Sequence, residues 1–279
     1  MKTGVLIASH IYYPDQLARL DMCLDSIRCQ TLLPDILVSV SFANDDYKRE
    51  FSSIIRKYPT VKFKLQAQQK YQMEHILTLS LLVNDYDMVM FCDDDDTYLP
   101  MRVENFVEAF KSTKEHCYTA GIQFGGVRET KNAENPDSSP EYWAYGIPPS
   151  LLKEFFNRIK GYEDLMRHKF ADMYLRNYLR RTGGDSIIFA TLLPDITGLT
   201  MYQYTIDNPN SICARHIAQK QSLKTANAMI RDNITLALIC DRTDLVEKDM
   251  RAASAPLSRL HEVVPDAHRI KKLTSILYK

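Results

Sequence analysis

Four consecutive aspartates, Asp93 to Asp96, directly follow an apolar run at residues 88–92. Two carboxylates about 5 Å apart repel each other by about 3 kcal/mol at an effective dielectric constant near 20, so four together need compensation. They can take up protons, extend into water, or bind a divalent cation, and hard oxygen ligands suit Mg²⁺ or Mn²⁺. Such an ion keeps coordination positions for phosphate oxygens. The cluster therefore predicts a metal–diphosphate site, with a solvated acidic turn capping the next helix as the alternative.

The apolar pattern around this cluster predicts alternating strands and helices. Strands are expected at 5–8, 36–42, 61–65 and 88–92, and helices between them at 17–30, 47–57 and 75–83. This alternating order is typical of a parallel sheet with helices on its faces. The sequence thus predicts an α/β fold in which ligands bind at the carboxyl ends of the strands.

Three groups of polar residues stand where expected strands end. Ser9 and His10 follow the first strand, residues 44–46 follow the second, and the four aspartates follow the fourth. Because the carboxyl ends of parallel strands meet at one edge of the sheet, we expect the three groups to line one crevice. This expectation depends on strand order alone.

The second half of the chain has weaker signals. Helices are expected at 102–111, 150–159 and 164–181, strands at 117–124 and 186–193, and a polar surface or lid loop at 125–140. The residues after about 214 look mainly helical. We expect a main domain at 1–214, divided near residue 100 into two halves, with a helical extension at 215–279 packed on it.

The segment from Phe91 to Pro100, followed by Arg102, resembles the Asp-x-Asp segment of nucleotide-sugar glycosyltransferases with the GT-A fold. In that family an apolar strand leads to Asp-x-Asp-Asp, three residues and then Pro. The stretches 23–30 (Cys-Leu-Asp-Ser-Ile-x-x-Gln) and 34–39 (Pro-Asp-Ile-x-Val-Ser) also resemble the family's first helix and second strand.

The likeness covers residues 4–110 closely and 140–200 loosely. The chain is similar in size to the small family-2-like transferases that large algal DNA viruses encode. The resemblance implies a GT-A fold, with a Rossmann-like, mainly parallel sheet flanked by helices and with 1–214 as the catalytic domain. Residues 1–100 would be its nucleotide-binding half and 101–214 its acceptor half.

The activity that this resemblance implies is metal-dependent transfer of a sugar, with inversion. The donor would be a UDP-sugar, with xylose as a guess, and the acceptor a hydroxyl group of a glycan or glycoprotein, as in glycan biosynthesis. Mn²⁺ or Mg²⁺ would neutralise the charge that builds on the departing nucleoside diphosphate.

The resemblance also assigns roles within the aspartate cluster. Asp93 would contact the ribose, the metal or a metal-bound water, Asp95 would bind the metal, and Asp94 would help to bind the nucleotide. Four aspartates in a row allow a shift of one residue in these roles. His216 is a candidate third metal ligand, although a single histidine is more often structural.

At the other strand ends, Ser9 and His10 would line the pocket for uracil and ribose. A histidine packed in the core at the strand end is the alternative for His10. Asp45 or Asp46 matches the acidic pair that the family places near the base.

An inverting transferase needs a general base that deprotonates the acceptor hydroxyl. Asp185, after a Gly-Gly turn, fits the family context for this base best, with Glu163, Asp164 and Asp172 as rivals. Asp185 could instead cap a helix, and one residue can do both.

Further candidates lie on the acceptor side. Arg215 or Lys220 could assist the leaving diphosphate. Trp143 and Tyr145 could stack on the face of an acceptor sugar, or they could form a hydrophobic plug beside the sheet.

A phosphatase of the haloacid-dehalogenase type is the main alternative function, because Asp93-x-Asp95-x-Thr97 after an apolar strand matches its nucleophile motif. That family usually has Gly in place of Asp96, and its motif commonly opens the fold. A nucleotidyltransferase would need a Gly-rich phosphate loop after the first strand, which this chain lacks. A non-catalytic glycan- or Ca²⁺-binding module would need no base, but calcium-loop spacing is absent.

Composition restricts the remaining classes. The 279 residues carry 35 basic and 35 acidic side chains, so the sequence offers no reason to expect nucleic acid as a partner. Six scattered cysteines and the lack of a long apolar stretch favour a reduced, soluble, cytoplasmic protein without a transmembrane segment. The basic stretch 269–273 could touch a membrane surface, although a solvated helix face is the more common use of such a sequence.

Overall fold

The structure is a computed structural model, and it describes residues 1–112, 122–123, 142–161, 163–167, 171–183, 188–189 and 202–203. The helical extension expected at 215–279 lies outside the described residues, as do the expected surface loop at 125–140 and most of the strand expected at 186–193. The division of the chain at residue 214 stays a prediction.

A seven-stranded sheet forms the centre of the described part, in the order β3-β2-β1-β4-β7-β6-β8. Its strands are β1 (Thr3–Ile11), β2 (Asp35–Phe42), β3 (Lys62–Leu65), β4 (Met88–Asp93), β6 (Ile122–Gln123), β7 (Tyr145–Ile147) and β8 (Ile188–Phe189). The first four strands are parallel, whereas β7 runs antiparallel to both of its neighbours. The predicted α/β fold with a mainly parallel sheet is therefore confirmed.

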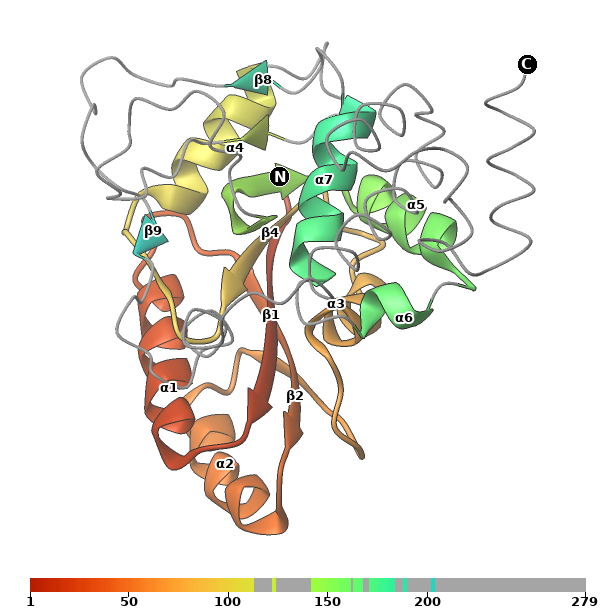
Figure 1. The fold of residues 1–279 in the computed structure, drawn as a ribbon. Helices are drawn as coiled ribbons and strands as arrows, with labels where there is room; N and C mark the ends of the chain where they lie inside the picture. Colours follow the sequence, from red (N-terminus) through yellow and green to blue (C-terminus); the bar gives the residue numbers. More distant parts are fainter. Residues whose placement is uncertain are drawn as a thin grey trace, which may run out of the picture. The chain divides into compact units, whose positions relative to one another are not determined.

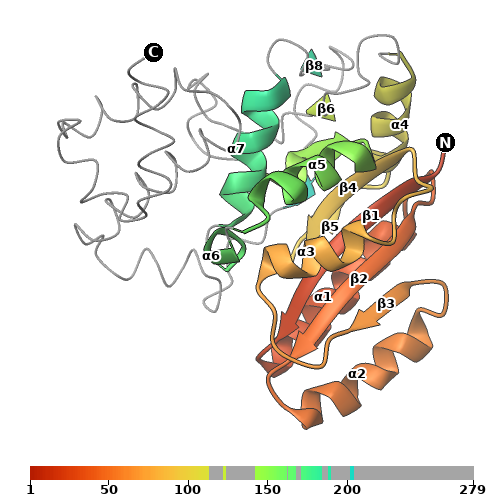
Figure 2. The same ribbon diagram turned by 90° about the vertical axis from the view of Figure 1, so that its right-hand side faces the viewer.

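The helices cover the two faces of this sheet as right-handed connections require (Figures 1 and 2). From β1 the chain moves through α1 (Pro14–Arg28) to β2 and through α2 (Asp45–Lys57) to β3, so these two helices share one face. It then returns past β1 to β4 through α3 (Gln72–Ser80), which places α3 on the opposite face. The order of the strands reverses between β1 and β4, and their carboxyl ends are where a ligand is expected.

More helices follow β4 along the chain. They are α4 (Arg102–Ser112), α5 (Pro149–Ile159), α6 (Glu163–Met166) and α7 (Ala171–Gly183). The last three contact α3, so they extend the helical layer on its face of the sheet (Figure 2). The single helix expected at 164–181 is therefore divided into α6 and α7.

The central strands are buried on both faces. Val5, Leu6 and Ile7 of β1 and residues 88–92 of β4 have no exposed surface. Strands covered on both sides have continuous apolar sequences rather than alternating ones, which is why the sequence located them well. The continuously buried run ends at Ile7 on β1 and at Cys92 on β4, just before Ser9 and the aspartates.

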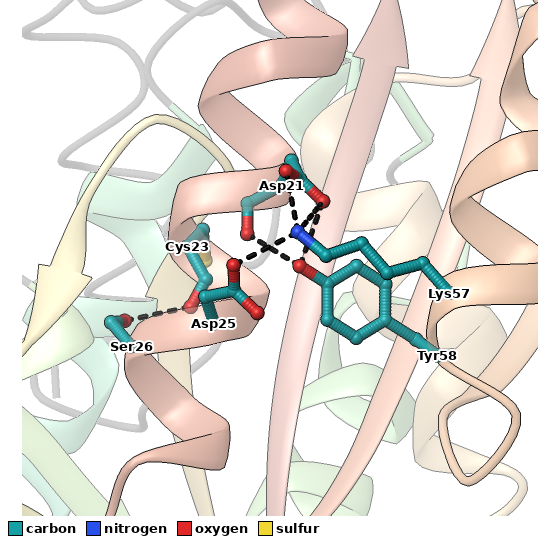
Figure 3. Close-up of polar contacts among 6 residues, drawn as sticks. All are labelled: Asp21, Cys23, Asp25, Ser26, Lys57 and Tyr58. Atoms are coloured by element: carbon teal, nitrogen blue, oxygen red, sulfur yellow. Dashed lines mark hydrogen bonds and ion pairs between the residues drawn. The ribbon is translucent and has the colours of Figure 1, made fainter.

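Polar side chains of α1 contact the end of α2 and the residue that follows it (Figure 3). The Lys57 ammonium donates to Asp21 at 2.8 Å and to Asp25 at 2.9 Å, and the Tyr58 hydroxyl donates to Asp21 Oδ1 at 2.7 Å. These contacts hold the two helices on one face of the sheet, far along the chain from the aspartate cluster.

The strand β7 was not expected from the sequence, which indicated only an aromatic, proline-stiffened segment there. Gly146 pairs with Met90 of β4, and a Cβ atom at Gly146 would lie 2.5 Å from the ring of Phe106. A glycine is required for this close approach of β7 to α4.

Candidate functional site

The aspartate cluster forms a tight turn between β4 and β5 (Thr97–Tyr98). The turn closes where the Asp96 amide donates to the Asp93 carbonyl at 3.2 Å. The strand β9 (Tyr202–Gln203) pairs antiparallel with β5 and brings Tyr202 against the turn. A residue more than a hundred positions away in the sequence therefore shapes the cluster.

Tyr202 holds both ends of this turn. Its hydroxyl oxygen accepts from the Asp93 amide at 3.1 Å, and its O–H donates to Asp96 Oδ2 at 2.7 Å. Asp96 is almost completely buried, with 1% of its surface exposed. Asp96 thus stabilises the turn, and the other three aspartates are the candidates for binding a ligand.

The Asp93 carboxylate is held by two side chains that the sequence did not suggest. Gln72 Nε2, at the start of α3, donates to Asp93 Oδ1 at 3.0 Å. The hydroxyl of Tyr142, which lies just before β7, donates to the same oxygen, and Gln72 also contacts that hydroxyl at 3.0 Å. No local pattern marks Gln72 or Tyr142, because their roles depend on contacts between distant elements.

Asp94 links the cluster to the neighbouring strand. Ser9 Oγ, near the end of β1, donates to Asp94 Oδ2 at 2.6 Å. The structure therefore brings together the first and third of the polar groups that strand order placed at one edge of the sheet. The contact spans the reversal point between β1 and β4, where ligands of such sheets bind.

The electrostatics of the cluster fit a site that takes up positive charge. Burial, followed by the charge of Asp96, raises the pKa of Asp93 well above its usual range. Burial and the charge of Asp95 raise the pKa of Asp94 to about 7, against the opposing hydrogen bond from Ser9. Ionising this group costs free energy, and a bound divalent cation would remove that cost.

The four aspartates supply the hard oxygen donors that Mg²⁺ or Mn²⁺ prefers. Within the described ranges, however, no group of three or more His, Cys, Asp or Glu side chains is arranged to hold a metal ion. The candidate ligand His216 lies outside these ranges, as do Arg215 and Lys220. The predicted metal site thus has a suitable donor set at Asp93 and Asp95, and it stays a prediction.

Arg102, which follows the cluster in the sequence, does not face this site. It is fully buried, and its guanidinium lies over the rings of three aromatic side chains, at 4.7 Å from Tyr98, 4.8 Å from Phe106 and 5.1 Å from Tyr202. Its Nη2 donates to the carbonyl of Trp143 at 2.7 Å. Arg102 therefore packs the layer beneath the turn.

Two aromatic candidates are also packing residues where the structure describes them. The ring of Trp143 stacks on Tyr202 at 3.9 Å between centroids with an interplanar angle of 5°, and Tyr145 has no exposed surface. Of the two uses that the sequence allowed, the hydrophobic plug matches this burial.

The end of β2 contributes differently from what the family pattern suggests. Asn44 caps α2 by accepting from the Tyr47 amide at 3.0 Å, and Asp45 and Asp46 occupy the exposed first turn of that helix. Asp46 pairs with Arg49 on the same helix. A role of these two acids near a base stays a prediction.

A chain of hydrogen bonds connects β1, β2 and α3 instead. His10 Nδ1 lies 2.7 Å from Ser41 Oγ, which lies 3.0 Å from His75 Nε2. His75 Nδ1 lies 2.8 Å from Ser39 Oγ. The sequence singled out His10 alone, because His75 appeared only as one residue of an apolar helix.

One rival for the general base comes near the cluster. Burial is the main reason that the pKa values of Asp93 and Tyr142 are raised, and the charge of Asp172, in the first turn of α7, adds a smaller increase to both. Asp185, the first choice from the sequence, and Asp164 are not described well enough to be compared with it: the first lies outside the described residues and the second has no described side chain.

In the described part of the chain, no helix combines the length and the apolar character that a membrane span requires. This matches the absence of a long apolar stretch in the sequence. The proposed contact of the basic stretch 269–273 with a membrane concerns residues that the structure does not describe.

Comparison with solved structures identifies the same fold in a larger protein. The structure of S. aureus TarS 1–349 in complex with UDP-GlcNAc matches with a TM-score of 0.54 at 13% identity, over 98% of this chain and 78% of that one. A second structure of S. aureus TarS, at 12% identity and a TM-score of 0.46, covers 87% of this chain but 43% of its own. This chain thus spans less than half of that TarS chain.

Sequence comparison provides the family. No curated protein sequence matches the chain. The model of glycosyl transferase family 2 matches residues 11–183, which include α1 to α7 and the whole aspartate cluster. The expectation of a GT-A, family-2-like fold is confirmed, and the chain belongs to glycosyltransferase family 2.

Proposed function

We propose that this protein transfers a sugar from a UDP-sugar to a hydroxyl group of a glycan acceptor, with inversion and with the help of a divalent cation. The observation that carries this proposal is the bond between Ser9 and Asp94 across the reversal point of the sheet, beside carboxylates that resist ionisation. The UDP carrier is supported by the UDP-GlcNAc complex of TarS. Xylose as the sugar, and a glycoprotein as acceptor, stay predictions from the resemblance.

Asp93 and Asp95 are the residues that would hold Mn²⁺ or Mg²⁺ here. The ion would supply positive charge opposite the leaving diphosphate. Gln72 and Tyr142 both donate to Asp93 Oδ1 and so restrict the orientation of this carboxylate. Asp96 supports the turn from below through Tyr202.

Asp172 is our candidate for the general base. It stands in the first turn of a helix, close to the place just before a helix where the family often has its base, and its charge acts on Asp93 and Tyr142. It also lies inside the region that matches the family model, which ends two residues before Asp185. On this proposal the Asp172 carboxylate takes the proton of the acceptor hydroxyl as that oxygen attacks the anomeric carbon.

Thermal denaturation with UDP and Mn²⁺ tests the proposal directly. Together, at about 100 times their dissociation constant, the ligands stabilise the protein by about 2.7 kcal/mol and raise its Tm by several degrees. Asp95→Ala should abolish this rise, whereas the exposed α2 variant Arg49→Ala should retain it. If no nucleoside diphosphate raises the Tm in a metal-dependent way, the proposed function is wrong.

The phosphatase alternative gives a different result in the same preparation. Release of inorganic phosphate from sugar phosphates, with a covalent adduct trapped on Asp93, would support it instead.

A further inference from the structure

A buried chain of hydrogen bonds leads to His10 through residues that have no role in the function proposed so far. Its members are Gln66, Ser39, His75, Ser41 and His10, in that order. Ser39 and Ser41 have no exposed surface and His75 is 1% exposed. One end of the chain is the partly exposed Gln66, and the other is the Nε2 atom of His10.

Both imidazoles are neutral near pH 7, so each carries a single N–H. Burial is the main reason that the pKa of His75 falls to about 4, and the neighbouring His10 and Lys70 lower it further while Glu74 opposes them. Burial also lowers the pKa of His10. Each hydroxyl in the chain likewise has one hydrogen to donate, so the direction of every bond can be worked out.

The direction is set at the Gln66 end. Gln66 Nε2 donates to Ser39 Oγ at 2.7 Å, so the Ser39 hydroxyl keeps its hydrogen for its other neighbour, His75 Nδ1. His75 must then carry its proton on Nε2 and donate it to Ser41 Oγ, which also accepts from the Lys70 amide at 3.4 Å.

The Ser41 hydroxyl hydrogen therefore has His10 Nδ1 as its acceptor, and the proton of His10 is on Nε2. If every bond ran in the opposite direction, the Gln66 amide group in its present orientation would offer the Ser39 hydroxyl no acceptor. The hydroxyl would then be buried and unsatisfied, and His10 Nε2 would still lack a partner. That arrangement leaves two groups unsatisfied instead of one, which disfavours it. In the described residues, His10 Nε2 has no hydrogen-bond partner.

We propose that Ser39, His75 and Ser41 are positioning residues that fix His10 as the Nε2–H tautomer, which donates a hydrogen bond to an oxygen atom of the bound nucleotide. This rests on the proposed function, which places a nucleotide at the carboxyl ends of β1 and β4. The group recognised is a carbonyl or phosphate oxygen, because an amino group has no lone pair to offer to an N–H donor.

The position of His10 agrees with this role. It follows Ser9, which bonds to the aspartate cluster, so the donor lies one residue from the contact across the reversal point. Its imidazole is partly exposed and lies beside the ring of Tyr12, which is 51% exposed, at 6.0 Å between centroids. The Nε2 atom itself is buried, so the neighbouring side chains have to move before a ligand can reach it.

Gln66→Glu tests the direction of the chain. A glutamate carboxylate accepts from Ser39, so every bond reverses and the proton of His10 moves to Nδ1. Ser39→Ala removes the hydroxyl that donates to His75, so that His75 and His10 can each adopt either tautomer. Ser80→Ala is the matched control, since Ser80 is similarly buried on α3 but its hydroxyl donates, among the described residues, to the Leu77 carbonyl at 2.7 Å and not to the chain.

Two measurements on each variant separate the possible failures. Long-range ¹H–¹⁵N spectra of the histidines, assigned with His10→Gln, report the tautomer in the free protein, and calorimetry with UDP and Mn²⁺ reports affinity. We expect His10 protonated on Nε2 in the wild type and on Nδ1 in Gln66→Glu. We also expect UDP binding to weaken about three- to tenfold in Gln66→Glu and Ser39→Ala but not in Ser80→Ala.

A wild-type His10 with its proton on Nδ1 would overturn the inference, and so would variants that bind UDP as tightly as Ser80→Ala does. Both results leave the proposed function intact. Absence of UDP binding by the wild-type protein would overturn the proposed function, and with it the role of His10 toward a nucleotide, whatever its tautomer.

Discussion

The two ends of the candidate site differ in how their buried polar groups are stabilised. At the ends of β1 and β2, neutral imidazoles and hydroxyls satisfy one another in a single chain. At the end of β4, carboxylates of like charge lie close together, and their pKa values rise because burial, followed by the charge of neighbouring carboxylates, opposes their ionisation. The first arrangement is complete without added charge, whereas the second favours a bound cation.

One edge of a sheet can therefore combine two kinds of polar group. The hydrogen-bonded side chains at β1 and β2 stay neutral, whereas the carboxylates at β4 change their charge on binding. A nucleotide presents a neutral base and a charged diphosphate, so these two kinds of group match its two ends. The following predictions test that division, from the largest expected effect to the smallest.

The largest effect is expected from Asp172→Asn. Removing a general base lowers the transfer rate by about 10²- to 10⁴-fold, whereas donor binding should remain, because Asp172 acts on the acceptor. Transfer is measured with a UDP-sugar and calorimetry measures UDP binding. Asp185→Asn is the parallel variant, and a larger loss of transfer there would assign the base to Asp185 instead.

The acidic end should make the metal-free protein less stable as pH rises. The pKa of Asp94 is about 7 in the folded protein and near 3.8 when unfolded, so the folded state binds more protons between these values. Stability from this group is present below pH 3.8 and is lost as pH rises through 7. Asp94→Asn should therefore stabilise the metal-free protein at pH 7.5 by about 2–4 kcal/mol in urea unfolding, with no gain at pH 3.5.

A similar gain for Asp94→Asn in the presence of saturating Mn²⁺ and UDP would contradict this explanation. The bound cation should reverse the sign of the effect, because it stabilises the ionised carboxylate that asparagine lacks.

The neutral end should show the opposite slope. The pKa of His75 falls to about 4 in the folded protein, against 6.5 for an ordinary histidine, so the unfolded state binds more protons between these values. Its contribution is present above pH 6.5 and is lost as pH falls toward 4, by at most about 3 kcal/mol. His75→Gln should flatten the decline of unfolding free energy between pH 6.5 and 4.5, and an unchanged slope would mean that another group titrates there.

The smallest effect concerns the support of the acidic turn. Tyr202→Phe removes the hydroxyl that bonds to the Asp93 amide and to Asp96, which should cost about 1–3 kcal/mol of unfolding free energy because Asp96 stays buried. The half-exposed Tyr12 supplies the control, since Tyr12→Phe should leave stability almost unchanged. Equal effects of the two variants would show that the turn holds without Tyr202.

Several features of the fold could be predicted without a structure. The presence of the first four strands, their parallel direction and the position of Ser9 and the aspartates at one edge all follow from continuous apolar runs and short polar ends. These signals are local, since a buried parallel strand is apolar along its whole length. The family could also be recognised from the sequence, because the family model begins at residue 11 and includes the cluster.

Only the tertiary structure decided which side chains act on those ends. Gln72, Tyr142 and Tyr202 come from three separate elements and have no distinguishing local pattern. His75 appeared in the sequence as one position of an apolar helix, yet it contacts two serines of β2, one of which contacts His10. The periodicity of a segment indicates which of its faces is buried, but the partner of a buried polar group depends on how distant segments pack. The helices, the strands and the acidic cluster could therefore be predicted from the sequence, whereas the side chains that orient the cluster could not.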